Sequence, residues 1–452
     1  MNIGLICVVS LGLLAYKYLS NRNMVNFFVV LQFLIFRCYN LGITGHGTPI
    51  RPDDMALLLI ILFLIKKKST GMLHLNAIGN VVKCFILFLI ISMFVSIFFK
   101  DLPILQVIKE TRNFVFVLSI FIVCNLNKGQ IDEILYKVFM LHCIFCVIFI
   151  IQTFIPSLGI LSDMESERIS MTGYLGFRRF YGYPPLMAFG CLYAFLLFPN
   201  NKNNKKLYIA LNFLALLLVQ SRGMMLNIVL LIVLASVLFK ASTTKKIIYV
   251  STAIILVVFV NMFIFSGDTG SRTSNDINTI MSSNIMDIEK PDGEATLTFR
   301  IWVLANRLRA ISEGGLLDGI FGLGLFVELP LNEIMKRGLI SVAAPTYEGN
   351  YGIYTPDISY ANHLAFLGYV GSALFWSIFI LMIAKSYKLR RNCRYAQICL
   401  LYLIYMIASG FNNMEISSSS CLIMPFILMM GAVAENNELI KNKYGRYSYS
   451  KL

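Results

Sequence analysis

Charged side chains are scarce in this chain of 452 residues, where Asp, Glu, Lys and Arg together make up only 14%. A soluble protein of this length needs roughly a quarter of its residues charged to solvate its surface, so we exclude one or several soluble domains. The ten cysteines do not indicate a disulfide framework, because the long polar segment contains none of them. Hydrophobic residues make up 57% of the chain, and the mean hydropathy is +0.72. These values predict an all-α integral membrane protein.

Apolar runs alternate with short polar segments along most of the sequence. Their lengths suit a hydrocarbon layer ~30 Å thick and predict about 12 or 13 transmembrane helices. The first run also resembles the core of a signal peptide, but no basic residue precedes it and no small-residue cleavage site is evident, so we keep it as a helix. The predicted spans lie near residues 3–16, 24–40, 53–65, 80–99, 107–125, 134–154, 182–198, 207–220, 223–239, 246–265, 361–384, 396–410 and 418–434.

Three parts follow from this pattern. Residues 1–265 are predicted to hold the first ten helices with short loops, residues 266–360 one large loop, and residues 361–452 the last helices and a basic tail. A polar stretch, 267–293, lies in the large loop.

Basic residues predict the orientation of the chain. They gather in five segments, 66–68, 202–206, 240–246, 385–394 and 441–451, which the positive-inside rule places in the cytoplasm together with the C-terminus. The large loop then lies outside, and it carries 12 Asp plus Glu against 7 Lys plus Arg, a net of −5. The overall net charge of +15 therefore reflects topology and does not indicate a nucleic-acid partner.

Arginines on the predicted outer side are the first candidates for a binding site. Arg222 lies in the turn Ser221-Arg222-Gly223 between two spans, and Arg178 and Arg179 precede another span. A guanidinium group near a helix end often serves only to reach the membrane surface. Several of them converging would suit a diphosphate, because their forked N–H donors bind phosphate oxygens bidentately.

Arg300 opens a predicted helix, residues 300–311, in the large loop. Apolar residues recur there at spacings of three and four, at Ile301, Leu304, Leu308 and Ile311. This spacing predicts one packed face, with Arg307 pointing elsewhere. A simple amphipathic helix and a functional one are both compatible with the pattern.

These motifs together resemble the O-antigen polymerase and ligase superfamily. The similar pieces are the Ser221-Arg222-Gly223 turn, the stretch from Arg300 to Gly324 with its Gly-x-Gly end, and the stretch from Asp357 to Gly371. Arg179, Gly182 and Pro185 also resemble the family's approach to an earlier span. The resemblance covers about residues 175–385. It implies a fold similar to the GT-C class, with helices in one large extracytoplasmic loop.

The residue eleven positions before Gly368 separates the branches of that superfamily. The ligase branch has a histidine there, whereas this chain has Asp357, which is similar to the Wzy-type polysaccharide polymerases. His363, five positions before Gly368, remains a competitor for the same role, because a histidine titrates near neutral pH. The resemblance therefore favours a polymerase and leaves a ligase as the nearest alternative.

The resemblance implies a specific reaction. A sugar hydroxyl attacks the anomeric carbon of a glycan carried on undecaprenyl diphosphate, at the outer face of a bacterial inner membrane. Arg222, Arg300, Arg178 and Arg179 are expected to bind the diphosphate, and Asp357 or His363 to act at the acceptor hydroxyl. No cofactor is implied, and the implied partners are a chain-length regulator and a flippase. A polysaccharide-lipid flippase or transporter is the alternative of another class, although the polar candidates gather at the outer face and are not spread through the spans.

Other polar residues allow both a functional and a structural interpretation. Tyr360 ends an aromatic outer segment that suits stacking on sugar rings, although tyrosines also gather at membrane interfaces. Glu110 and Arg112 lie near an outer helix end and predict a local ion pair or a cavity-facing pair. His142 beside Cys143 and Cys146 lies within a span, where packing is favoured over metal binding or redox work. No outer cluster has metal-ligand spacing, so no metal is expected.

Overall fold

The computed structural model describes residues 3–36, 52–66, 76–155, 183–198, 204–219, 221–239, 251, 297–326, 328–337, 350–352, 358–410, 416 and 419–449. This part of the chain is almost entirely helical, which confirms the predicted all-α class. Each predicted span overlaps one or more described helices, except 246–265, which lies outside the described residues apart from residue 251. Three of the described helices are long and apolar enough to cross a membrane, by length and composition: Ala77–Phe98, Lys128–Phe154 and Ser359–Leu389.

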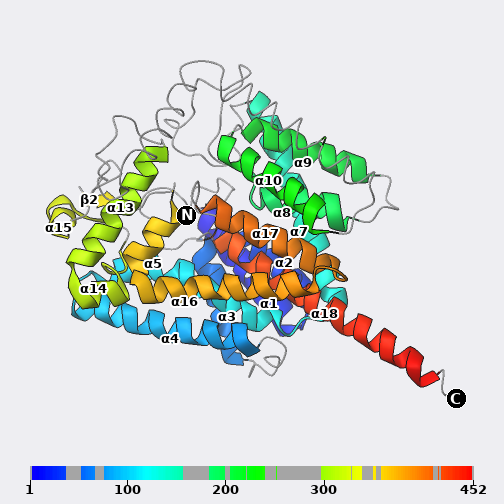
Figure 1. The fold of residues 1–452 in the computed structure, drawn as a ribbon, viewed down its shortest axis with the longest axis horizontal. Coiled ribbons are helices and arrows are strands. Elements are labelled where there is room, and N and C mark those ends of the chain that lie inside the picture. Colours follow the sequence, from blue (N-terminus) through cyan, green and yellow to red (C-terminus); the bar gives the residue numbers. More distant parts are fainter. Residues whose placement is uncertain are drawn as a thin grey trace.

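The helices follow one another with few other elements between them (Figure 1). Two segments depart from α geometry, the 3-10 turn η2 (Phe116–Leu118) and the π-helical stretch η6 (Tyr193–Leu197). The α-helices are α1 (Ile3–Ser20), α2 (Met24–Ile35), α3 (Pro52–Lys66), α4 (Asn76–Phe98), α5 (Ile104–Val115), α6 (Ser119–Val123), α7 (Lys128–Phe154), α8 (Met187–Leu192), α9 (Lys205–Val219), α10 (Arg222–Leu238), α13 (Leu297–Glu313), α14 (Gly315–Phe321), α15 (Leu331–Lys336), α16 (Ser359–Leu389), α17 (Arg394–Ser409) and α18 (Ser419–Tyr449).

Local sequence signals set where several helices begin. Asn127 accepts a hydrogen bond from the Gln130 backbone N–H at 2.9 Å, and the Gln130 side chain accepts one from the Asn127 N–H at 3.1 Å, which makes a capping box at the start of α7. Ser221 caps α10 by accepting a hydrogen bond from the Met224 N–H at 3.4 Å. The turn that contains Arg222 is therefore a helix start.

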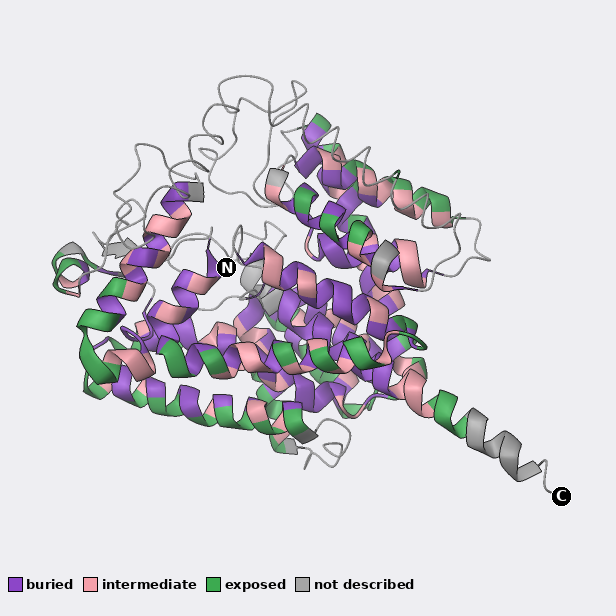
Figure 2. Cartoon of the chain, in the orientation of Figure 1, coloured by how far each residue is buried: buried purple, intermediate pink, exposed green. Residues whose placement is uncertain are grey.

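Burial divides the helices into packed and exposed faces (Figure 2). On α4, the face toward α16 is buried, whereas Leu87, Ile90, Phe94 and Phe98 on the other face are each more than half exposed. Such a continuous exposed apolar stripe is unfavourable in water and suits contact with lipid.

The two ends of the bundle differ. At one end lie α13, α14, α15 and a two-stranded antiparallel sheet, in which β1 (Glu328–Pro330) pairs with β2 (Asn350–Gly352). We call this the loop end. Helix α18 projects from the opposite end, toward the C-terminus (Figure 1).

Helix α16 is sharply kinked at Gly368, where the backbone has φ +64° and ψ −168°. An uninterrupted helix would hold residues 360 and 376 about 24 Å apart. Instead the rings of Tyr360 and Trp376 stack at 4.6 Å. Residues 359–367 therefore form a first arm that is bent toward the second arm, residues 369–389. The predicted span over 361–384 coincides with α16, which is long and apolar enough to cross a membrane, but the apolar pattern did not predict the kink at Gly368.

Candidate functional site at the loop end of the bundle

The two glycine motifs of the sequence meet at the loop end. Gly322, with φ +74°, lies against Gly368, and the Leu323 N–H donates a hydrogen bond to the Ala365 carbonyl at 2.6 Å. A Cβ atom on Gly322 would lie 2.5 Å from the Ala365 carbonyl oxygen and 2.6 Å from the Gly368 nitrogen. The two backbones approach this closely because neither glycine has a side chain.

Lys100, which follows α4, links the end of that helix to this glycine contact through hydrogen bonds. Its ammonium group donates hydrogen bonds to the Asp318 carboxylate and to the Gly322 carbonyl. Burial lowers the pKa of Lys100, while the hydrogen bond and charge of Asp318 oppose that shift. Arg337 adds a second fastening, because it donates to the Lys100 carbonyl at 2.8 Å and to the Leu323 carbonyl at 3.3 Å.

Helix α13, which carries Arg300, packs beside the first arm of α16. Phe299 and Val303 of α13 form a buried cluster with Ile358 and Ala361. The other end of α13 also touches α16, since Ser312 Oγ lies 3.3 Å from the Tyr369 hydroxyl. The predicted loop helix therefore exists and lies along the first arm of α16.

The packed face of α13 differs from the predicted one. Arg307 is only 1% exposed, whereas Ile301, Leu304 and Leu308 are half-buried. The expectation that Arg307 points away from the packed face is wrong, because the partners of α13 select a neighbouring stripe that runs through the arginine. Sequence reasoning missed this residue, since an arginine at the edge of an apolar stripe is usually solvated.

Arg300 and Arg307 give this stripe a positive charge. The two residues are seven positions apart, nearly two helical turns, so they lie on the same face of α13. Burial lowers the pKa of the Arg307 guanidinium to about 10, which still leaves it charged at neutral pH. Its Nη1 donates a hydrogen bond to the neighbouring Asn306 side chain at 3.1 Å. Arg300 is half-buried, so it is the more accessible of the two guanidinium groups to an anionic ligand.

His363 lies in the first arm of α16 and is 1% exposed. Its ring is bordered by the rings of Phe375 at 4.9 Å, Trp376 at 5.6 Å and Phe114 at 5.7 Å. Tyr360 is also engaged, because its hydroxyl donates a hydrogen bond to the Ile407 carbonyl of α17. Both predicted site residues thus take part in packing at the loop end.

Three further charged groups lie near the start of α3 and in the second half of α5. Arg112 Nη1 is 3.2 Å and 3.4 Å from the two carboxylate oxygens of Asp54. The predicted pairing of Arg112 with Glu110 is therefore replaced by a cross-helix pair, although Arg112 is close enough to Glu110 to act on it electrostatically. Glu110 itself is 3% exposed.

The structure describes the remaining predicted site residues only in part. Arg222 is the first residue of α10, which packs against α17, whereas α13 packs against α14 and α16. The helices that carry Arg222 and Arg300 therefore rest on different neighbours. Arg178, Arg179 and Asp357 lie outside the described residues, as does the polar stretch 267–293.

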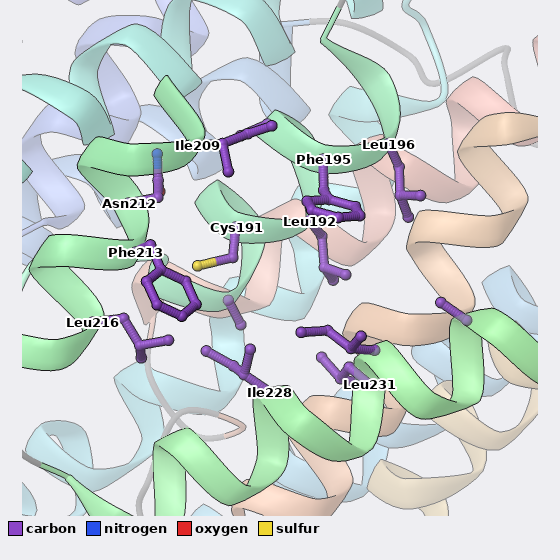
Figure 3. Close-up of a pocket in the computed structure, with 14 residues that line it drawn as sticks. Cys191, Leu192, Phe195, Leu196, Ile209, Asn212, Phe213, Leu216, Ile228 and Leu231 are labelled. Carbon is purple, nitrogen blue, oxygen red and sulfur yellow. The ribbon is translucent and has the colours of Figure 1, made fainter. Parts of the chain in front are cut away.

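A separate cavity of about 170 Å³ lies among α8, η6, α9 and α10 (Figure 3). Its lining side chains are apolar except for Asn212 and the thiol of Cys191. On the other side of Asn212 lies His142, with Nε2 2.9 Å from Asn212 Oδ1 and Nδ1 2.6 Å from the Pro185 carbonyl. His142 thus ties α7 to α9 and to the segment before α8, beyond the simple packing that its sequence context suggested. The cavity offers few groups for chemistry compared with the loop end.

Within the described residues, no group of three or more His, Cys, Asp or Glu side chains is arranged to hold a metal ion. A comparison of the whole chain with known protein families finds no family that matches, and no curated protein matches it either.

Proposed function

We propose that the protein is a polysaccharide polymerase of the bacterial inner membrane, an inverting glycosyltransferase that joins oligosaccharide units carried on undecaprenyl diphosphate. The proposal combines the motif resemblance with one structural observation. The Gly-x-Gly segment that ends α14 packs on the kink of α16 at Gly368, and Arg300, Arg307 and His363 lie at this end of the apolar helical bundle. Motifs far apart in sequence thus meet where a lipid-linked substrate has both membrane and water beside it.

In this reaction the acceptor hydroxyl oxygen forms a bond to the anomeric carbon of the donor glycan. The bond between that carbon and the phosphate oxygen breaks, and its electron pair leaves with the diphosphate. Fixed guanidinium groups lower the barrier by stabilising the charge that grows on the leaving oxygen. Arg300 and Arg222 are assigned to this task, with Arg178 and Arg179 as further diphosphate ligands and the large loop on the outer face.

The test is chain growth by purified protein supplied with lipid-linked repeat units. Wild type is expected to lengthen the glycan, and Arg222→Ala and Arg300→Ala are each expected to lose roughly 10²-fold or more in rate, the effect of removing one charge-stabilising donor. Arg309→Ala is the matched control, because Arg309 is an exposed arginine on the same helix.

Product identity separates the alternatives. Transfer of finished glycan to a second acceptor would replace the polymerase by a ligase. Movement of the lipid-linked unit across the bilayer without any change in glycan length would replace it by a flippase. Chain growth that is unchanged in both arginine variants would refute the assigned site.

A further inference from the structure

Glu110 is a buried acid at the loop end that none of the predicted roles uses. It lies on the packed face of α5 with Val107, Thr111 and Phe114, and it is 3% exposed. Within the described part of the chain, no hydrogen bond to its carboxylate is found, and Arg112, which acts on it electrostatically, is bonded to Asp54.

Keeping a carboxylate buried in this way is energetically unfavourable. Moving a carboxylate out of water without hydrogen bonds is strongly unfavourable, and ionisable residues at membrane depth are retained mostly where they work. A residue with a purely structural task at this position would match its apolar neighbours on the same face. The side chain is not completely enclosed, because 3% of it remains exposed.

Glu110 lies close to the candidate site. Phe114, one helical turn further along the same face of α5, has its ring 5.7 Å from that of His363 in the first arm of α16. That arm is the one beside which α13 carries Arg300. His363 itself is surrounded by three aromatic rings. Glu110 is thus a buried acid one helical turn from the aromatic ring that contacts His363.

We propose that Glu110 is the general base that receives the proton of the acceptor hydroxyl, a role that rests on the proposed polymerase function. As the hydroxyl oxygen bonds to the anomeric carbon, its proton passes to a Glu110 carboxylate oxygen, and the diphosphate leaves with the electrons of the broken bond. The charged group that acts on Glu110 is Arg112 on its own helix, and Arg112 is bonded to Asp54 at the start of α3. Arg112 holds Asp54 and so keeps α3 beside α5.

The experiment measures kcat and KM for chain growth with purified wild type, Glu110→Gln and Glu110→Asp, together with the thermal unfolding temperature of each. Glu110→Gln keeps the shape and removes the base, and general bases contribute about 10²-fold to 10⁴-fold. We expect a loss of kcat in that range with KM for the donor unchanged, and a smaller loss in Glu110→Asp. Glu133→Gln on α7 is the control, because Glu133 pairs with Lys137 at an exposed site far from α5.

If Glu110→Gln unfolds far below wild type, the comparison rests on Glu110→Asp, which retains the acid but shortens its reach. A loss of kcat smaller than about tenfold in every folded variant overturns the assignment, since a base contributes more than that. A rise in KM with kcat unchanged overturns it as well, because that result describes a binding residue. Wild-type protein that fails to lengthen the glycan refutes the polymerase itself, whereas normal growth by wild type and by Glu110→Gln refutes only the role of Glu110.

Discussion

The contact between Gly322 and Gly368 predicts how three glycine substitutions should differ. Gly368→Ala places a Cβ atom 2.5 Å from the Gly322 nitrogen and 2.7 Å from the Ile320 carbonyl carbon. It also forces a side chain into φ +64° and ψ −168°, a backbone region that only glycine occupies readily. Both penalties act on the backbone contact between Gly322 and Gly368, which connects the large loop to α16.

The magnitude follows from these two terms. Backbone strain of this kind costs about 1–3 kcal/mol, and forcing extra atoms into a packed contact costs about 1–3 kcal/mol more. We therefore expect Gly368→Ala to lower the free energy of unfolding by roughly 2–6 kcal/mol. Overlapping backbone atoms cannot move aside as a flexible side chain can, so the upper half of this range is favoured.

Two other glycines near α14 separate the terms. Gly315 has φ +81°, but no atom lies within 4 Å of the position that a Cβ atom would take, so Gly315→Ala incurs strain alone, about 1–3 kcal/mol. Gly319 lies inside α14 with its nearest neighbour at 3.9 Å, so Gly319→Ala should be neutral or stabilising by roughly 0.5–1 kcal/mol, the helix preference of alanine.

The assay is thermal unfolding of the three variants in one detergent, together with glycan length in cells that express them at equal levels. The expected order of unfolding temperature is Gly319→Ala highest, then Gly315→Ala, then Gly368→Ala. Equal unfolding temperatures for Gly368→Ala and Gly319→Ala would show that the two backbones do not meet, and the docking of the loop on α16 would then have to be abandoned.

Two further predictions concern charged and ionisable groups. Lys100→Met leaves Asp318 without its cation, and we expect a loss of about 1–3 kcal/mol that the double variant Lys100→Met with Asp318→Asn partly recovers, as measured by thermal unfolding; independent, additive losses would contradict the pairing. Burial, aided by Glu435, raises the pKa of the Cys393 thiol to about 11, and the thiolate is the reactive form, so its labelling by iodoacetamide should keep rising to about pH 11 in mass spectrometry of the labelled protein. An ordinary thiol levels off above about pH 9, and a plateau there for Cys393 would mean that it is not buried as described.

Much of the helical framework could be predicted from the sequence, because an apolar run must satisfy its backbone groups internally wherever it lies in lipid. The spans near 134–154 and 223–239 correspond to α7 and α10, and their starts follow from Asn127 and Ser221, whose side chains bond to the next turn. These are local properties, set by residues within a few positions of one another. Arg300 could also be identified as a candidate from the sequence, because its segment has helical periodicity in an otherwise polar loop.

Only the tertiary structure decided what those elements touch. The kink of α16 at Gly368 packs against Gly322, nearly fifty residues earlier, and no local pattern links the two. Arg307 is buried because α13 lies along the first arm of α16, and Arg112 bonds Asp54 because the first turn of α3 lies beside the last turn of α5, with Glu110 left on the packed face. Periodicity shows that a helix has a face to bury, but the partner chosen for that face is a property of the whole chain, and at the loop end that choice determines which ionisable groups are close enough to act together.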